Sequence, residues 1–381
     1  KGEHPLMLGV WVNIDYVWVS KSVTPKEFTA MKKVTVFGGG ATGYVVSAEL
    51  SVRGFDVCLC EEPDYADSLD AARQHGEIAI SGPGIDGVGK IGLITTDLQV
   101  AMDWADQVII CAISNRDEHI ARMLAPHLHI GQSILLSAGN FGSFLFRKVF
   151  DEEKAADVIV GETCGNLFPS RIVGEAKTVT GFPWSPKPAA AWPTKDTDAL
   201  IEAFADIYEL SKAPSILCCA LDVGNMMSHI APVLLNAGAI ENCKGSYYIF
   251  RQGISPAVIH VVDALWDEKK NVMDALGYPA SPSLSGLFSP LMDDSFHGLD
   301  DFKNLEGPNT VTGRHIIEDT PTLDCLMISV AAAMGVDVPL FRAMVKVVSA
   351  MNQTDYYAQG RTLENLGLGH LKGQDLVAYF A

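Results

Sequence analysis

Val34-Thr-Val-Phe-Gly-Gly-Gly-Ala-Thr-Gly43 is the stretch that decides the fold of this chain. Its first four residues are β-branched or aromatic, which favours a strand, and the residues that follow it, up to Arg53, have the pattern of an amphipathic helix. Between strand and helix, Gly38, Gly40 and Gly43 have the spacing G-x-G-x-x-G. This order of strand, glycine turn and helix is typical of a Rossmann dinucleotide-binding unit.

Each glycine has a physical task in such a turn. Gly38 permits the tight turn, Gly40 lets a pyrophosphate approach the backbone, and Gly43 lets the helix pack closely on the strand. The free N–H groups at the start of the helix, where Ala41 and Thr42 stand, would face the phosphates. We therefore expect a dinucleotide cofactor here; the alternative is an ordinary glycine-rich turn without a ligand.

A second expected strand, 56–60, ends at Glu61, which stands roughly 20 residues after the first glycine. A carboxylate at this point would accept hydrogen bonds from both hydroxyls of the adenosine ribose and would repel a 2′-phosphate. Residues 62–65 contain no Arg or Lys that could receive such a phosphate. The sequence therefore predicts NAD, with NADP less favoured, unless Glu61 is only a solvated strand end.

The composition favours a globular protein of two domains that acts on small molecules. The 381 residues are 48% hydrophobic and 19% charged, which is enough apolar material for two cores. A net charge of −18, without Lys or Arg clusters, argues against nucleic-acid binding. The eight cysteines include no CxxC pair and mostly stand in apolar runs, so we expect reduced core residues of a cytoplasmic protein rather than disulfides or a metal site.

Residues 1–30 stand apart from the rest of the chain. The apolar segment 6–20 is interrupted by Asn13 and Asp15, is too short to span a bilayer, and lacks the basic start and the cleavage site of a signal peptide. We therefore expect no membrane association. Met31-Lys-Lys-Val resembles the natural start of a nucleotide-binding domain, so we interpret residues 1–30 as an extension, either a non-native segment or an extra strand.

From residue 31 to residue 213, short apolar strands alternate with helical patterns, as in a parallel sheet. The glycine-rich segment 77–94 interrupts this alternation and has the pattern of a β-hairpin insert. In open parallel sheets, the loops at the strand ends meet the ligand. We therefore expect Ser114, Gly139 and Glu162, which follow the later strands, to face the cofactor.

Beyond this region the pattern changes. Four prolines between residues 183 and 193 indicate a surface stretch, a helix is expected at 196–210, and beyond Pro214 the chain is almost wholly helical in pattern. The sequence thus predicts an α/β fold. An N-terminal Rossmann domain, 31–213, is followed by an all-helical substrate domain, 214–381, which could bury the surface of a homodimer.

One expected helix of the second domain carries a candidate acid-base residue. Asn225 and His229 are four residues apart and share a helix face, and Pro232 should bend the helix beside the histidine, because it cannot donate to the Ser228 carbonyl. Reduction of a C=O or C=N bond by NADH needs a group that gives a proton near neutral pH, and histidine is the usual one. A core histidine without a chemical role is the alternative.

A second cluster, Arg314-His-Ile-Ile-Glu-Asp319, could complete such a site. A carboxylate against an imidazole N–H fixes the tautomer of the ring, and an arginine can bind a substrate carboxylate through two hydrogen bonds. The sequence alone does not decide whether Asp319 reaches His229 or pairs with His315, which stands four residues before it.

From Met31 to its C-terminus the chain resembles the opine dehydrogenase family, which includes octopine, nopaline and N-(1-carboxyethyl)amino acid dehydrogenases. The resemblance is carried by the glycine turn and, in the same order, by Gly161-Glu-Thr163, Asn225 with His229-Ile-Ala-Pro-Val-Leu-Leu-Asn236, Arg314 with Glu318-Asp319, and Gly360-Arg-Thr-Leu-Glu-Asn-Leu-Gly367. It implies that His229 and Asp319 are the catalytic dyad and that Arg314 lies near the substrate carboxylate. His315 replaces an aromatic residue, and Ser137-Ala-Gly139 stands where relatives often have Asn-Pro-Gly, which puts the substrate in question.

The resemblance implies an NAD(H)-dependent dehydrogenase that condenses an amino acid with a 2-oxo acid such as pyruvate under reduction, and that runs the reverse oxidation. Asn225 would position the substrate or the nicotinamide. Two alternatives stay open. One is a 2-oxo acid reductase of the ketopantoate type, although that type relies on a lysine and the helix carrying His229 has none; the other is a non-catalytic NAD(H) sensor.

Overall fold

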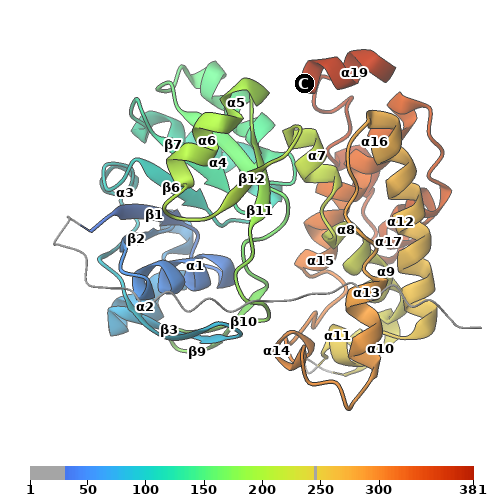
Figure 1. Ribbon diagram of the computed structural model, residues 1–381, viewed down its shortest axis with the longest axis horizontal. Helices are drawn as coiled ribbons and strands as arrows, with labels where there is room; N and C mark the ends of the chain where they lie inside the picture. Colours follow the sequence, from blue (N-terminus) through green and yellow to red (C-terminus); the bar gives the residue numbers. More distant parts are fainter. Residues whose placement is uncertain (1–30, 244–246) are drawn as a thin grey trace, which may run out of the picture. The chain divides into compact units, whose positions relative to one another are not determined.

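The computed structural model describes residues 31–243 and 247–381, and residues 32–381 form one compact unit. The expectations for residues 1–30 therefore lie outside the described residues. Along the unit, an α/β half comes first and a helical half follows (Figure 1).

The α/β half is built on an eight-stranded sheet with the strand order β12-β11-β8-β7-β6-β1-β2-β5. Its strands are β1 (Lys33–Phe37), β2 (Asp56–Cys60), β5 (Leu93–Thr95), β6 (Gln107–Ile110), β7 (Ser133–Leu136), β8 (Ile159–Thr163), β11 (Lys187–Ala191) and β12 (Leu210–Lys212). Neighbouring strands pair in parallel, apart from β8 and β11, which are antiparallel. The sequence order reverses at β1, and such a switch point is where a Rossmann sheet binds its ligand. The expected Rossmann fold is confirmed.

Helices cover both faces of this sheet, and alternate side chains of β1 enter different apolar layers. The helices are α1 (Ala41–Val52), α2 (Asp70–His75), α3 (Leu98–Met102), α4 (Asp117–Leu124), α5 (Gly142–Glu153) and α6 (Thr197–Phe204). Val34 and Val36 join a core with residues of α1, whereas Phe37 joins a core with residues of α3, α4 and α5. Burial on both faces explains why β1 is almost continuously apolar.

A smaller sheet of four strands, in the order β4-β3-β10-β9, packs against α1. Strands β3 (Glu77–Gly82) and β4 (Ile85–Lys90) form the expected hairpin, and β9 (Ser170–Gly174) and β10 (Lys177–Thr180) form a second hairpin that the sequence did not reveal. The close packing of β4 against α1 requires a glycine at position 89, because a Cβ there would lie 2.6 Å from the carbonyl oxygen of Ala48. Strand β9 also carries Arg171, which enters the site described below.

The expected proline-rich surface stretch is confirmed for Pro183, Pro186 and Pro188, which are exposed, but is wrong for the alanine run that follows them. Residues Lys187–Ala191 form β11, which pairs with β8 and β12, and Ala189, Ala190 and Ala191 are fully buried. Alanine is a weak strand former, so a short alanine run between prolines carries little sequence signal. Its small side chains let α6 pack against this part of the sheet.

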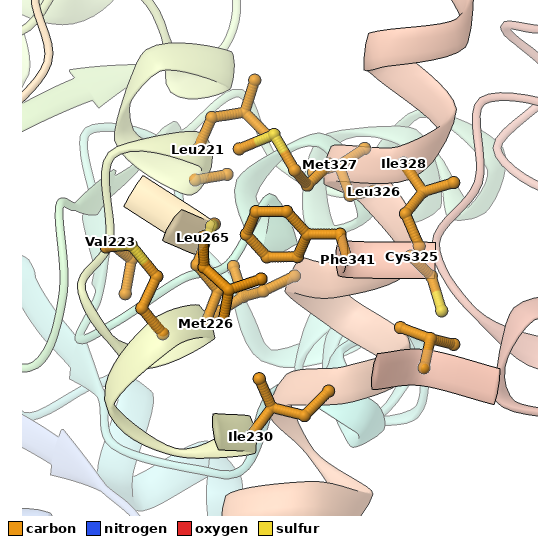
Figure 2. Close-up of a cluster of buried hydrophobic side chains, with 14 of the residues drawn as sticks. Leu221, Val223, Met226, Ile230, Leu265, Cys325, Leu326, Met327, Ile328 and Phe341 are labelled. Carbon is orange, nitrogen blue, oxygen red and sulfur yellow. The ribbon is translucent and has the colours of Figure 1, made fainter. Parts of the chain in front are cut away.

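The helical half is organised around its long helix α12. The elements are α7 (Ile216–Leu221), α8 (Asn225–Ser228), α9 (Ile230–Leu235), α10 (Ala237–Asn242), α11 (Ile249–Gln252), α12 (Pro256–Leu276), α13 (Ser285–Phe288), α14 (Asp300–Lys303), α15 (Arg314–Ile317), α16 (Cys325–Met334), α17 (Pro339–Met351), α18 (Tyr356–Gln359) and α19 (Gly373–Phe380). The side chain of Ser255 caps the start of α12, and Gly277, with φ 72°, ends it. Leu265 of this helix belongs to the same buried apolar cluster as Met226 and Phe341 (Figure 2).

The change from sheet to helices falls between Lys212, where β12 ends, and Ile216, where α7 begins. A domain boundary near residue 213 stays a prediction, because the two halves pack as one compact unit. The segment Ile216–Leu235 reaches a mean hydropathy of 1.4, and 78% of that window is buried inside the fold, so we assign it to the core of the helical half.

Candidate active site

The glycine turn after β1 has the geometry that a bound pyrophosphate requires. Gly38 has φ +124°, and a Cβ there would lie 2.7 Å from the carbonyl oxygen of Cys111. A Cβ at Gly43 would lie 1.7 Å from the carbonyl oxygen of Gly38, whereas a Cβ at Gly40 would meet nothing within 4 Å. Gly38 and Gly43 are thus needed for packing, and Gly40 is open to a ligand. The residues of the turn that line a cavity of about 440 Å³ are Gly40, Ala41 and Thr42.

Glu61 lies against the glycine turn. Its Oε2 accepts a hydrogen bond from the Gly39 N–H at 2.8 Å, and its Oε1 accepts one from the Glu62 N–H at 2.9 Å. Burial raises the pKa of Glu61 above its usual value. The carboxylate is therefore anchored beside the turn, at the end of β2, where a ribose could share it.

Arg116 places a cation beside Glu62, although residues 62–65 themselves contain no Arg or Lys. Its guanidinium lies 4.6 Å from the centre of the Tyr65 ring and forms an ion pair with Glu62. Glu62 also contacts His119 at 2.8 Å. Burial alone would raise the pKa of Glu62, but Arg116 and His119 hold it below its usual value. The charge of Arg116 is thus already matched by a carboxylate.

His229 and Asp319 meet in the interior, although they are 90 positions apart. His229 Nδ1 lies 2.5 Å from Asp319 Oδ2, and the two residues are 8% and 3% exposed. His229 stands at the junction of α8 and α9, beside the bend that Pro232 predicts, and Asp319 directly precedes a π-helical turn, Thr320–Asp324. This buried contact allows the carboxylate to fix the tautomer of the imidazole.

His315 does not take the place of His229. Its ring packs edge-on against the ring of His229, with the centroids 4.5 Å apart. Burial, and then the neighbouring charge of His229, lower the pKa of His315 well below its usual value. The alternative pairing of His315 with Asp319 is therefore wrong in this structure: Asp319 contacts His229, and His315 is a neutral ring packed beside it.

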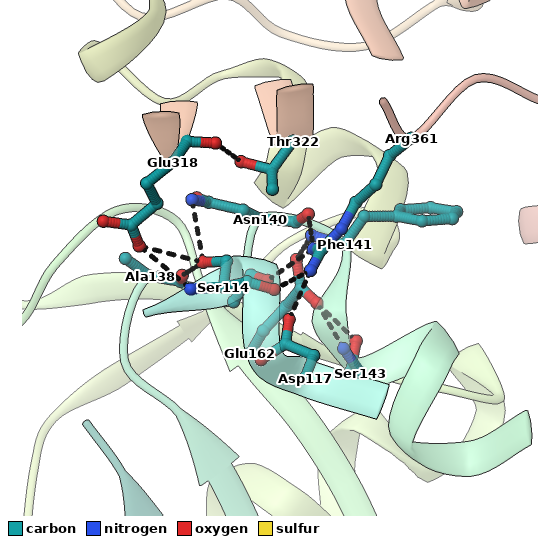
Figure 3. A network of polar contacts seen from close by, with 11 residues as sticks. Ser114, Asp117, Ala138, Asn140, Phe141, Ser143, Glu162, Glu318, Thr322 and Arg361 are labelled. Carbon is teal, nitrogen blue, oxygen red and sulfur yellow. Dashed lines mark hydrogen bonds and ion pairs between the residues drawn. The ribbon is translucent and has the colours of Figure 1, made fainter. Parts of the chain in front are cut away.

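A buried polar network joins the loops after β6 and β7 to the helical half (Figure 3). Glu318 accepts a hydrogen bond from the Ser114 N–H at 3.0 Å, and Arg361 contacts Asp117 at 2.7 Å. Arg361 also donates to the carbonyl oxygen of Asn140 at 2.5 Å. Burial raises the pKa of Asp117 to about 7, although Arg361 opposes this rise. The network fixes the loops that border the first cavity.

Ser114, Gly139 and Glu162 support the cavity from behind, which corrects the expectation that they face the cofactor. Glu162 is fully buried and accepts hydrogen bonds from the N–H groups of Phe141 and Ser143 at 2.9 Å each. Gly139 packs on it, because a Cβ there would lie 2.3 Å from the Cβ of Glu162. Ser114 is 2% exposed, and its hydroxyl contacts Glu318.

The path of the loop after β7 explains why Gly139 does not line the cavity. Ala138, Asn140 and Phe141 have φ values of 57°, 50° and 73°, which non-glycine residues rarely adopt. The loop therefore curls so that Ala138 and Asn140 line the cavity while Gly139 turns toward Glu162. Such strained backbone persists only where its surroundings hold it, and here the carboxylate of Glu162 does so.

A second cavity, of about 310 Å³, lies next to the first, and the two share lining residues, among them Asn225 and Arg314. His229 lines this second cavity. The side chain of Arg314 is 44% exposed, and its Nη1 lies 3.6 Å from Glu318 Oε2. The structure thus brings His229, Asn225 and Arg314 to one cavity, with Asp319 in contact with His229, and their roles toward a substrate stay predictions.

Two further cationic residues line the second cavity and are not predicted from the sequence. They are Arg171 of β9 and Lys187 of β11. Strand β9 is not expected from the sequence, and β11 falls within the stretch assigned to the surface. Neither residue belongs to a motif that would mark it.

The helical half also matches a known family. Residues 212–352 match the family model described as NAD/NADP octopine/nopaline dehydrogenase, alpha-helical domain. The resemblance to the opine dehydrogenases is confirmed. The opine dehydrogenase of Arthrobacter sp. (strain 1C) is 27% identical to this chain over 355 residues, which cover 89% of this chain and 96% of that opine dehydrogenase.

Solved structures share the fold. An octopine dehydrogenase in complex with NADH and agmatine has a TM-score of 0.67 at 18% identity, covering 91% of this chain and 98% of that one. A ketopantoate reductase from Ralstonia eutropha has a TM-score of 0.56 at 16% identity, covering 84% of this chain and 98% of that one. Because opine dehydrogenases and ketopantoate reductases both have this fold, the fold alone does not select the reaction.

Proposed function

We propose that this chain is an NAD(H)-dependent opine dehydrogenase. It condenses the amino group of an amino acid with a 2-oxo acid such as pyruvate under reduction, and it catalyses the reverse oxidation. One observation carries the proposal: the buried pair of His229 and Asp319 lies at a cavity that Arg314 and Asn225 also line, next to the cavity of the glycine turn.

The cofactor would be held by the α/β half. Backbone N–H groups of Gly40, Ala41 and Thr42, which line the first cavity, would bind the pyrophosphate, and Glu61, beside the turn, would bind the adenosine ribose. Bound NADH supplies the hydride. Ser114, Gly139 and Glu162 take part as positioning residues, because they hold the loops that border the cavity.

His229 would move the protons of the reaction. A neutral imidazole can take a proton from the ammonium group of the amino acid, which frees the nitrogen lone pair to attack the oxo carbon. The imidazolium can then give this proton to the oxygen of the adduct, and the same imidazole can move a second proton from the adduct nitrogen to that oxygen, which leaves as water. The protonated imine that remains accepts the hydride, and the imidazole is again neutral. Asp319, at 2.5 Å, stabilises the imidazolium and keeps the other ring nitrogen directed to the substrate.

Arg314 and Asn225 would position the substrate. A guanidinium can bind a carboxylate through two parallel hydrogen bonds, which fixes the orientation of the reacting carbon. Asn225 is the first residue of α8, one helical turn before His229, and it lines both cavities. Its amide can therefore contact the nicotinamide or the substrate.

A ketopantoate-type reductase is the second candidate, and one observation favours it: Lys187 lines the same cavity as His229. This lysine comes from β11 and not from the helix that carries His229. An NADH-depletion screen of 2-oxo acids against an amino acid panel separates the candidates. NADH oxidation that depends on the amine supports the opine reaction, turnover of the oxo acid alone supports the reductase, and NADH binding without turnover indicates a sensor.

We also propose a cytoplasmic location and a homodimer. All eight cysteines are free, as is usual for proteins of a reducing compartment. The long helical half offers the surface that a second copy could cover. Light scattering of the purified protein would test the dimer.

A further inference from the structure

The second cavity is cationic in a protein that is strongly acidic overall. The chain has a net charge of −18, yet the lining of this cavity includes Arg171, Lys187 and Arg314 and, among the residues that the structure describes, no carboxylate. Three cations around about 310 Å³ repel one another unless an anion lies between them. The cavity therefore has the electrostatics of a site for an anionic ligand.

Arg171 makes hydrogen bonds without an ionic partner in the described part of the chain. Its Nε donates to the carbonyl oxygen of Glu306 at 2.5 Å, and its Nη1 donates to the carbonyl oxygen of Ser170 at 2.9 Å. Burial, and then the charge of Arg314, lower the pKa of Arg171 to about 10, although the charge of Glu306, which forms no ion pair with Arg171 in the described part of the chain, opposes this. Carbonyl oxygens orient this guanidinium but do not neutralise it, so a carboxylate would gain from binding there.

Lys187 is the most isolated of the three cations. It is half-buried, and its ammonium group has no hydrogen-bond or ion-pair partner within the described residues. Burial lowers the pKa of Lys187, and the Cys164 thiol is the group that opposes this. Part of the surrounding wall is aromatic, with Phe250 and Phe302 stacked at 4.1 Å. A lysine in such surroundings costs free energy unless a ligand supplies its counter-charge.

We propose that this cavity selects a dicarboxylic substrate, and that Lys187 binds its distal carboxylate. The proposal rests on the opine reaction proposed above, in which the condensed product carries two α-carboxylates. Arg314 and Arg171 bind those two groups, which leaves Lys187 for a third carboxylate. That carboxylate belongs to an acidic amino acid or to a 2-oxo diacid, because either one places it a few carbon atoms from the reacting centre.

Substrate pairs that differ in the distal carboxylate, which one member has and the other lacks, test this assignment. The full-length protein is assayed by NADH depletion in two arms. The first arm combines pyruvate with either L-glutamate or L-glutamine. The second arm combines L-alanine with either 2-oxoglutarate or 2-oxopentanoate. In one of the two arms, we expect the acidic member to have a kcat/KM at least about tenfold above its neutral partner. The arm that shows the preference identifies which substrate carries the distal carboxylate.

Lys187→Met keeps the length of the side chain and removes its charge. We expect the kcat/KM of the acidic substrate to fall at least about tenfold, mainly through KM, toward that of the neutral one. Lys212→Met is the matched control, because Lys212 lies on the adjacent strand β12, pairs with Asp198 and lies outside the cavity lining. Arg171→Gln should weaken the acidic and the neutral member alike, because Arg171 binds an α-carboxylate that both possess.

The outcomes separate this inference from the function on which it rests. Amine-dependent NADH oxidation that favours neutral substrates in both arms, or an acidic preference that survives in Lys187→Met, would overturn the role of Lys187 and leave the opine reaction standing. NADH oxidation that never depends on an amine would overturn both. Thermal unfolding of each variant shows whether a loss of activity reflects a loss of the fold.

Discussion

At the scale of single residues, His229 is held from its backbone and from its side chain. Its N–H donates to the carbonyl oxygen of Asn225 at 3.0 Å, and its own carbonyl accepts the Val233 N–H at 3.0 Å. Asp319 holds the ring at 2.5 Å. The group to which we assign the proton transfers is therefore oriented before a substrate arrives, which would lower the free-energy cost of reaching the reactive geometry.

His229→Ala should lower kcat by about two to four orders of magnitude, because acid-base catalysis typically supplies that much. NADH affinity should stay nearly intact, because the glycine turn and Glu61 lie in the other half of the chain. Asp319→Asn should also be severe, through loss of the preferred tautomer. Steady-state kinetics and NADH titration measure both effects. The pairing would be wrong if His315→Ala were as damaging as His229→Ala while Asp319→Asn had no effect.

Cofactor choice depends on Glu61. NAD(H) should be preferred over NADP(H) in kcat/KM by at least about tenfold, since a phosphate facing a carboxylate should cost more than about 1.4 kcal/mol. Glu61→Ser should narrow this ratio, because it removes the repelling charge while Arg116 remains close by. The kcat/KM values for NADH and NADPH give the answer directly. Equal use of both cofactors by the unmodified protein would show that Glu61 does not meet the ribose.

Residue chemistry predicts part of this site from the sequence and misses the rest. His229, Asp319 and Arg314 belong to motifs whose order and residue types point to their chemistry. Arg171 and Lys187 belong to none, and the role that we propose for them rests on the finding that neither forms an ion pair with another described residue. That property depends on which side chains surround a cation, and neighbours in the sequence do not reveal it.

At the scale of elements, the loop after β7 shows how one buried carboxylate maintains a strained turn. Glu162 accepts the N–H groups of Phe141 and Ser143 through different oxygen atoms, while three non-glycine residues of the loop have positive φ. Ala138 and Asn140 thereby reach the cavity of the glycine turn. A small change at Glu162 should therefore affect both the stability of the protein and its cofactor binding.

Glu162→Gln tests this dependence. The NH2 group of the glutamine would face a backbone N–H group, so that two buried donors meet without an acceptor between them. This should lower the free energy of unfolding by about 1–3 kcal/mol. The KM for NADH should rise as the loop relaxes. Glu153→Gln is the control, because Glu153 is 45% exposed at the end of α5, and its substitution should change stability by less than about 0.5 kcal/mol. Denaturant unfolding that does not distinguish the two variants would contradict the role of Glu162.

The contact between Asp117 and Arg361 should be sensitive to pH. Burial raises the pKa of Asp117 from 3.8 to about 7 in the folded protein. A raised carboxyl pKa contributes stability that is complete below the unfolded pKa and is lost as the pH rises through the folded pKa. The unfolding temperature of the unmodified protein, relative to that of Asp117→Asn, should therefore fall between about pH 4 and about pH 7 and change little above that.

Thermal unfolding across this pH range measures that difference, with Asp157→Asn as a control whose carboxylate is 98% exposed. The control should show no comparable trend. A difference between the unmodified protein and Asp117→Asn that stays flat, or that grows with pH, would mean that the carboxylate is fully ionised and stabilised by Arg361.

The sequence predicts a strand or a helix correctly where apolar residues dominate one face of that element. The buried strands β1, β6 and β7 and the hairpin of β3 and β4 follow from apolar runs and glycine turns. Strand β9 is different, because Ile172 and Val173 are exposed and its partner β10 pairs in turn with the distant strand β3. Such elements are stabilised by tertiary contacts, which local sequence patterns do not contain.

At the scale of the whole molecule, the site exists only because distant parts of the chain meet. Ser114 and Glu318 are 204 positions apart, and Asp117 and Arg361 are 244 positions apart. These contacts join the loops of the sheet to the helical half, and both cavities are lined from both halves. Among the described residues, no carboxylate lines the second cavity, although Glu318 and Asp319 contact two residues of its lining from outside, Arg314 and His229.

The central claim is that the amine is a substrate, and the most direct measurement follows NADH oxidation with pyruvate in the presence and absence of an amino acid, with the product identified by mass spectrometry. Our account predicts slow oxidation with the 2-oxo acid alone, a steep rise when the right amino acid is added, and a product that is a secondary amine with a carboxylate on each side of the nitrogen. Arg314→Lys should reduce that rise, because a point charge cannot reproduce a planar guanidinium. Reduction of the 2-oxo acid at full speed without an amine, yielding a 2-hydroxy acid, would contradict the account and select the ketopantoate-type reductase.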